Sequence, residues 1–222
     1  MTRNELLDRY RHLRGVNRQI NDAVMKLVPG AVMMEFGKRI GLLRGRTFVL
    51  DSEDDLALVC DLAVYIGKDG RSSALDRFAR TARFVPGSDE ALILSAMQES
   101  WFTVFEIECR HEIGGPVIRD VMREETFQFL DIGYEMTAKD GDRFGGRLLA
   151  VEGFVMTSGP ALPFDFEMGQ AVAEAVKHWH PGTARESRLA IEVYRAAIKT
   201  GAMQRLQFRS VGGEDDETSE AA

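Results

Sequence analysis

The hydrophobic pattern of this chain changes its period near residue 100, and that change limits the possible folds more than any other feature. Before it, apolar residues recur at steps of three and four, which places them on one face of a helix. From Trp101, in WFTVFEIECRH, they fall on alternate positions, which is typical of a strand with one apolar face. Helical spacing returns after residue 163. The sequence therefore predicts an α+β protein whose strands lie between two helical segments.

Turn and capping residues divide these two segments into separate helices. Pro29-Gly30 ends the first helix, and Ser52 with Asp55 has the spacing of a capping box. The tetrapeptide TFVL at 47–50 is either a short strand or an extended connector. The expected helices cover about 3–27, 31–43, 51–66, 73–82, 88–99, 164–179 and 184–200.

Five short strands are expected between the helices, at about 101–111, 117–122, 126–133, 146–151 and 153–158. Asp140-Gly141 indicates a turn, and Glu152-Gly153 the tight turn of a hairpin. Short strands with such frequent turns favour a small, five-stranded antiparallel sheet that is barrel-like. The expected organisation is a helical segment (1–99), a barrel-like β-domain (100–160), helices packed on it (161–211) and a disordered acidic tail (212–222).

Charge is distributed unevenly along the 222 residues, whose net charge is −7. Residues 1–50 contain ten Lys or Arg and four acids, a net +6, which leaves −13 for the remainder. Five of these negative charges lie in the tail GGEDDETSEAA, which is too polar to bury surface and is expected to stay solvated. The basic segment either binds an acidic partner or faces the acidic remainder of its own chain.

The composition is that of a globular, cytoplasmic protein, with 45% hydrophobic and 28% charged residues. No apolar run approaches the ~18 residues of a membrane span, and the polar N-terminus lacks the apolar region of a signal peptide. We therefore expect no membrane partner. Cys60 and Cys109 stand apart without a CxxC motif, which fits reduced thiols in a cytosol. Glycine-rich nucleotide motifs, HExxH and GxSxG are missing, and no cofactor is expected.

Arg119 and Asp120 form one candidate site. Adjacent strand residues point to opposite faces, so one of the two shares a face with apolar neighbours. As a functional pair they would provide an acid or an anchor at the rim of the barrel. As a structural pair, Arg119 would contact Glu106 or Glu108, and Asp120 would accept hydrogen bonds from turn amides.

Histidines support two further hypotheses. His178 and His180 share a face if the chain is extended before Pro181, and with His111 or an acid they could hold a metal. In a helix they would instead lie at a C-terminus, where the dipole favours them, and the expected metal content is none. His111 also shares a strand face with Cys109, as a base and a thiol would. The apolar character of that face favours a buried, inert Cys109.

Arg11, Arg14 and Arg18 recur at the helical spacing i, i+3 and i+7 and form a candidate basic patch. A helix that binds nucleic acid needs such a stripe. The alternative is a solvated helix face, and the acidic pI of about 5.2 argues against a dedicated nucleic-acid binder.

Two stretches carry a likeness to known proteins: VIRDVMREETFQFLDIGYEMTAKDGDRFGGRLLAVEGFVMTSG and the upstream FVLDSEDDLALVCD. With their RD strand, GD…R strand start and G…SG ending, they resemble a family of uncharacterised bacterial proteins, over about residues 40–160. Some relatives of that family carry a C-terminal zinc-binding SEC-C motif. This cysteine-rich motif is absent here, so the resemblance implies neither a zinc site nor a catalytic residue.

Together these patterns favour a bacterial, cytosolic, non-enzymatic binding or regulatory protein, whose β-domain and basic helices contact a protein partner. A metal-dependent hydrolase that uses His178, His180 and an acid is one alternative. A nucleic-acid-associated factor is the other, so whether the chain is an enzyme stays open.

Overall fold

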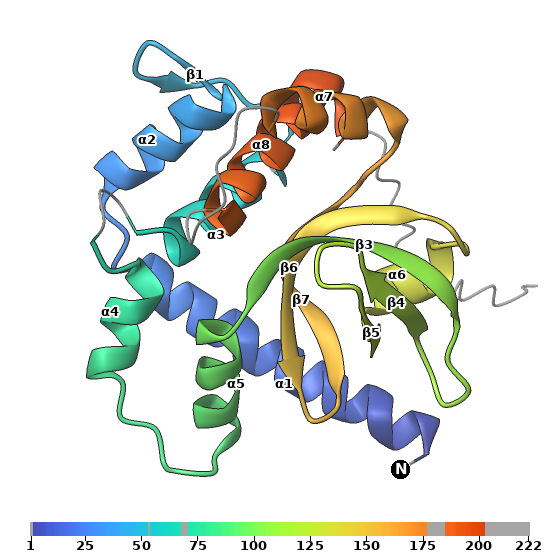
Figure 1. Ribbon diagram of the computed structural model, residues 1–222. Coiled ribbons are helices and arrows are strands. Elements are labelled where there is room, and N and C mark those ends of the chain that lie inside the picture. Colours follow the sequence, from blue (N-terminus) through green and yellow to red (C-terminus); the bar gives the residue numbers. More distant parts are fainter. Residues whose placement is uncertain (1, 53, 68–70, 177–184, 203–222) are drawn as a thin grey trace, which may run out of the picture.

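The computed structural model describes residues 2–52, 54–67, 71–176 and 185–202, and it combines helices with an antiparallel sheet (Figure 1). The α+β class predicted from the change of period is confirmed. Its helices are α1 (Arg3–Met25), α2 (Gly30–Ile40), α3 (Asp54–Tyr65), α4 (Ala74–Thr81), α5 (Asp89–Gln98), α6 (Ile132–Thr137), α7 (Phe166–Val176) and α8 (Arg185–Thr200).

Five strands form one antiparallel sheet with the order β5-β4-β3-β6-β7. They are β3 (Trp101–Arg110), β4 (Pro116–Asp120), β5 (Glu125–Gln128), β6 (Arg143–Val151) and β7 (Phe154–Pro163). The sheet curves strongly, and one isolated bridge between Phe129 and Val155 links its two ends. It is not closed, so the barrel-like sheet is an open, curved one. A separate hairpin, β1 (Leu43–Arg44) and β2 (Thr47–Phe48), follows α2.

The predicted hairpin at Glu152-Gly153 joins β6 to β7. Both residues have positive φ angles, 49° and 89°, which a two-residue turn between right-twisted strands requires. Val151 pairs with Phe154 across it.

The strand expected at 126–133 ends at Gln128 instead, and a short helix, α6, follows. Asp131 caps this helix, because its side chain accepts a hydrogen bond from the Gly133 amide at 3.2 Å. The helix places Tyr134 against Phe144, with ring centroids 4.8 Å apart, inside the curve of the sheet.

Three apolar clusters hold the molecule together. One fills the inside of the curved sheet, around residues such as Phe105 and Phe129. A second packs α1, α4 and α5 against β6 and β7. The third joins α2 and α3 to α7 and α8, with Phe102 of β3 at its base, so helices from both ends of the chain share one core (Figure 1).

The buried, inert Cys109 expected from the alternation is wrong, because this cysteine is exposed. Ile107 pairs with Ile118, but Cys109 pairs with Val117, so the register shifts between them. A bulge of this kind adds a residue to one strand and breaks the alternation of faces. The face periodicity of β3 therefore ends at Ile107.

Candidate binding site

A groove of about 620 Å³ lies where the end of α1, the start of α2, the end of α3 and the start of α4 meet. Its apolar lining is provided by Leu27, Pro29, Val32, Ala63, Ile66 and Ala74. Leu27 is 45% exposed, unusually high for a leucine beside other apolar residues. The groove therefore offers apolar surface that the described residues leave uncovered.

Arg71, Arg77 and Arg80 also line this groove. Arg77 donates from Nη1 to the Ser72 carbonyl oxygen at 2.8 Å and from Nη2 to that of Leu27 at 3.4 Å. Arg80 donates to Ser72 Oγ at 3.0 Å. Within the described part of the chain, none of the three forms an ion pair with a carboxylate. No acid among the described residues therefore neutralises their positive charges by an ion pair.

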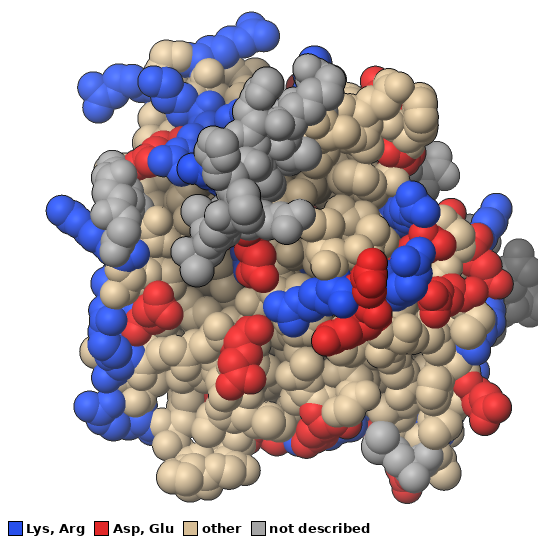
Figure 2. Space-filling model, in the orientation of Figure 1, with Lys and Arg blue, Asp and Glu red and all other residues tan. Residues whose placement is uncertain are grey.

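The local sequence fixes these arginines in place. Ser73 and Asp76 form a capping box, with Ser73 N donating to Asp76 Oδ2 and Asp76 N donating to Ser73 Oγ, each at 3.0 Å. The one acid of α4 is thus occupied at the helix start. Gly67 lies so close to Arg71 that a Cβ there would come within 1.8 Å of the Arg71 carbonyl oxygen. Only glycine fits at this approach. Figure 2 shows Lys and Arg side chains gathered along the edge of the molecule where α4 lies.

A buried ionic cluster lies between the helices and the sheet. Arg147 of β6 donates from Nε to Asp61 Oδ1 at 3.1 Å, and Tyr194 of α8 donates to Asp61 Oδ2 at 3.1 Å. The Arg147 guanidinium also lies over the Tyr65 ring, 4.1 Å from its centroid. Burial is the largest influence on the pKa of Arg147 and acts to lower it, but the electrostatic effects of Asp61, Tyr65 and Tyr194 and the hydrogen bond to Asp61 together raise this pKa. Burial raises the pKa of Tyr65 and of Tyr194, so both phenols stay protonated.

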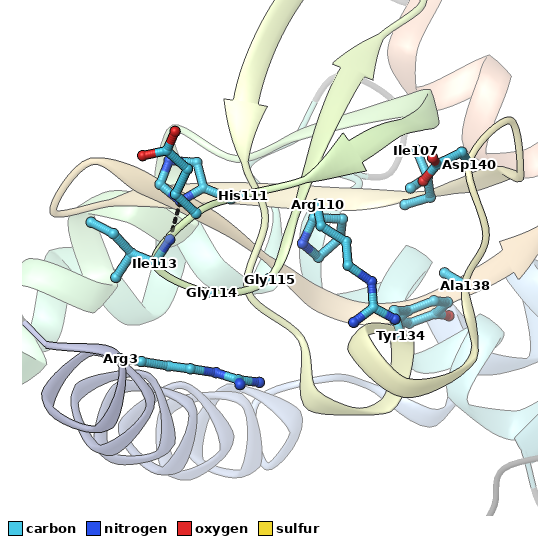
Figure 3. A pocket seen from close by; sticks show the side chains of 12 residues that line it. Arg3, Ile107, Arg110, His111, Ile113, Gly114, Gly115, Tyr134, Ala138 and Asp140 are labelled. Carbon is cyan, nitrogen blue, oxygen red and sulfur yellow. Dashed lines mark hydrogen bonds between the residues drawn. The ribbon is translucent and has the colours of Figure 1, made fainter.

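A smaller pocket of about 120 Å³ lies between the β3–β4 turn, α6 and the start of α1 (Figure 3). Arg3, Arg110 and His111 line it together with the acids Glu112 and Asp140. His111 Nδ1 accepts a hydrogen bond from the Ile113 amide at 3.2 Å, which uses one ring nitrogen within its own turn. Cys109 is not part of this lining, so the pocket does not pair the thiol with the imidazole. Charges of both signs give the pocket no clear ligand preference.

Arg119 and Asp120 make the contacts described for the structural pair. Arg119 lies 3.5 Å from Glu106 and 3.2 Å from Glu108. Asp120 is fully buried and accepts four hydrogen bonds, at 2.6–3.0 Å, from Thr103 Oγ1, Trp101 Nε1, Met122 N and Arg123 N. These bonds fix the turn after β4 onto β3.

The three arginines of the basic patch do not form one exposed stripe. Arg11 pairs with Asp8 at 2.7 Å, and Arg14 donates to the Thr157 carbonyl oxygen of β7. Arg18 is exposed. Arg9, which belongs to the same helix, pairs with both Asp89 and Glu152 at 2.6 Å. Much of the basic charge of α1 is therefore directed at the protein's own body.

His178 and His180 lie outside the described residues. In the ranges that the structure does describe, no three His, Cys, Asp or Glu side chains are grouped as metal ligands. None of the described helices has the length and apolar character needed to cross a membrane.

Sequence reasoning missed Asp61, Arg147 and the groove arginines. Asp61 and Arg147 each interrupt an otherwise apolar stretch, LVCDLAV and GGRLLAV, and such an interruption signals a buried, paired charge. The groove arginines were visible as RSSALDRFAR, where Arg77 and Arg80 share a helix face.

No curated protein and no solved structure matches the chain. A family model matches residues 4–198, which include the groove, the buried ionic cluster and the whole sheet. The chain therefore belongs to the family of unknown function DUF7986.

Proposed function

We propose that this protein is a non-enzymatic binding or regulatory protein, and that the arginine groove binds an acidic, amphipathic segment of another protein. One observation carries the proposal: Arg71, Arg77 and Arg80 surround an uncovered apolar lining without a carboxylate partner among the described residues. Membership of an uncharacterised family neither supports nor opposes this role.

The apolar lining and the arginines of the groove would contact different side chains of such a segment. Apolar side chains of a partner helix gain free energy when they cover Leu27, Val32 and Ile66, at about 25 cal/mol per Å² of buried apolar surface. Carboxylates at neighbouring helix positions then reach the guanidinium groups, whose planar forks match carboxylate geometry. An acidic amphipathic helix combines both features at the spacing of one helix face.

A nucleic-acid partner is the less suited alternative. Binding of unstacked bases relies on aromatic platforms, and the described lining of the groove contains none. Duplex binding relies on a continuous row of phosphate contacts, whereas Arg11 and Arg14 of α1 are engaged within the protein.

The cytosolic and bacterial setting belongs to the same proposal. Cys60 and Cys109 are both free, which fits a reducing compartment. The proposal also includes a relationship to proteins that carry a SEC-C motif, but it places no zinc site in this chain.

The experiment uses a fluorescein-labelled 16-residue peptide with leucines at helical spacing and glutamates between them. Fluorescence anisotropy should show saturable binding to the full chain. Arg71→Ala with Arg80→Ala should weaken it about tenfold or more, because each charge-assisted bond contributes about 1.5–3 kcal/mol. These two arginines are chosen because neither bonds to the backbone, unlike Arg77.

The matched control is Arg44→Ala with Arg46→Ala, two exposed arginines on the β1–β2 hairpin. It removes the same charge and should change the dissociation constant less than twofold. Equal losses of peptide affinity in both double variants would show that the groove arginines act only through the net charge of the protein. Tighter, arginine-dependent binding of single-stranded or duplex DNA would replace the protein partner by nucleic acid.

A further inference from the structure

A second pocket, of about 140 Å³, lies beside the buried ionic cluster, between the ends of α3 and α5 and the starts of α4 and α8. Arg147 and Tyr65 form part of its wall, with Ser73, Gln98, Ser100 and Ser187 around them. Ile66 borders both this pocket and the arginine groove, and it is the one described lining residue that they share. They are therefore neighbouring but separate sites.

The guanidinium of Arg147 has donors that no described residue accepts from. Its side chain is 7% exposed, and Nε donates to Asp61. Neither Nη1 nor Nη2 has an acceptor among the described residues, and neither is sealed off as a fully buried, unpaired atom. Buried guanidinium donors are costly unless an acceptor meets them. Arg147 thus presents two adjacent N–H groups to whatever fills the pocket.

Other donors converge on the same space. The first turn of α8 contributes Ser187 and backbone amides that have no partner within the helix. Gln98, at the end of α5, also lines the pocket. Ser73 and Ser100 are already engaged, since Ser73 Oγ accepts from the Asp76 amide and Ser100 Oγ donates to the Met97 carbonyl oxygen. The remaining donors suit a ligand with two acceptor oxygens.

The surrounding charges limit how negative that ligand can be. Asp61 already offsets the charge of Arg147, and Asp76 and Glu186 also border the pocket. Arg123 lies 3.6 Å from Glu186 and offsets its charge. A dianion would be repelled by Asp76, which has no ion-pair partner among the described residues, whereas a singly charged carboxylate has two oxygens at the spacing of Nη1 and Nη2. We propose that this pocket is a binding site for a small monocarboxylate, held end-on by Arg147 and by the first turn of α8.

The wild-type test titrates the ¹⁵N-labelled full chain with sodium acetate, at constant ionic strength set with chloride. Acetate should cause saturable shifts of the amide signals of Gln98 and residues 186–188, with a dissociation constant on the order of millimolar for so small a ligand. Acetamide has the same shape without the charge and should cause none. Inorganic phosphate should bind more weakly than acetate, because it carries more negative charge at neutral pH.

Two variants test the assignment to Arg147 and α8. Ser187→Ala should weaken acetate binding roughly fivefold, whereas Ser95→Ala, on the exposed face of α5, should leave it unchanged. Asp61→Asn removes the competing carboxylate, so acetate should bind about tenfold more tightly and raise the melting temperature of this variant more than that of the wild type. If Asp61→Asn does not fold, the titrations of the wild type, Ser187→Ala and Ser95→Ala test the proposal on their own. Unsaturable shifts, or equal shifts with acetamide, would overturn the proposal in favour of a pocket that holds only water.

Discussion

Arg14 of α1 donates from Nη1 to the backbone carbonyl oxygen of Thr157 on β7. Because β7 is the last strand of the sheet, this contact covers an edge carbonyl that no neighbouring strand can pair. Tyr134 does the same for the Ala161 carbonyl oxygen. Two side chains from distant parts of the sequence thus protect the edge of β7.

We expect Arg14→Ala to lower the free energy of unfolding by about 1.5–3 kcal/mol, the range for hydrogen bonds to charged groups. Arg18→Ala, in the same helix but exposed, should change it by less than about 0.5 kcal/mol. Urea denaturation of the two variants provides the comparison. Equal effects would show that Arg14 acts only through the charge of α1.

The ion pair between Asp61 and Arg147 should show strong non-additivity. Arg147→Met alone leaves a buried carboxylate without its counter-ion and should cost about 3–5 kcal/mol. Asp61→Leu combined with Arg147→Met removes both charges and should recover most of that loss. The attraction between two buried charges exceeds the free-energy cost of their desolvation by little. A double-mutant cycle by chemical denaturation measures the coupling. Additive losses would contradict a direct interaction between the two residues.

Asp120 should be essential for stability rather than for binding. Its carboxylate accepts four hydrogen bonds, so Asp120→Ala leaves several buried donors unpaired and should cost about 3 kcal/mol or more. Near-ultraviolet circular dichroism should also change, since Trp101 loses its indole partner. Asp140→Ala, at an exposed acid, is the matched control. Affinity for the acidic peptide should not change in Asp120 variants that stay folded.

Stability should fall in strong acid through the cluster of Arg9, Asp89 and Glu152. Hydrogen bonds from Arg9 hold the pKa of Asp89 down to about 2 and also lower that of Glu152. A carboxylate with a lowered folded pKa adds stability above its unfolded pKa of about 4, and this is lost as pH falls toward 2.

Urea denaturation between pH 2 and 6 measures this dependence. Arg9→Ala should flatten it, because the two carboxylates then titrate closer to their unfolded values. Arg11→Ala is the control, because Arg11 is an exposed arginine of the same helix that pairs with Asp8 and not with Asp89 or Glu152. An unchanged slope in Arg9→Ala would assign the acid sensitivity to other carboxylates.

Periodicity was enough to predict most elements of the fold. The apolar steps of α1, the capping residues before α5 and the Glu152-Gly153 turn all act locally, and local rules find them. The bulge after Ile107 and the helix that begins after Asp131 were missed. Both depend on a partner strand or on an aromatic side chain entering the core, neither of which a short window of sequence contains.

The sites were harder to predict than the fold because their residues meet only in three dimensions. Asp61, Arg147 and Tyr194 are far apart in the sequence, and the local sequence around each residue does not predict its contact with the other two. The candidate patch of Arg11, Arg14 and Arg18 was likewise read from the spacing within one helix. That spacing contains no information about Thr157, whose carbonyl oxygen accepts a hydrogen bond from Arg14.

The core that α2 and α3 share with α7 and α8 has a consequence for synthesis on the ribosome. Leu58 and Leu62 emerge early, but the faces that bury them, on α8, are made more than a hundred residues later. Until then the nascent chain exposes the apolar side of α3, a state that invites chaperone binding. Completion of this core therefore waits for α8, and we expect a chain that stops after β7 to be a substrate for proteolysis.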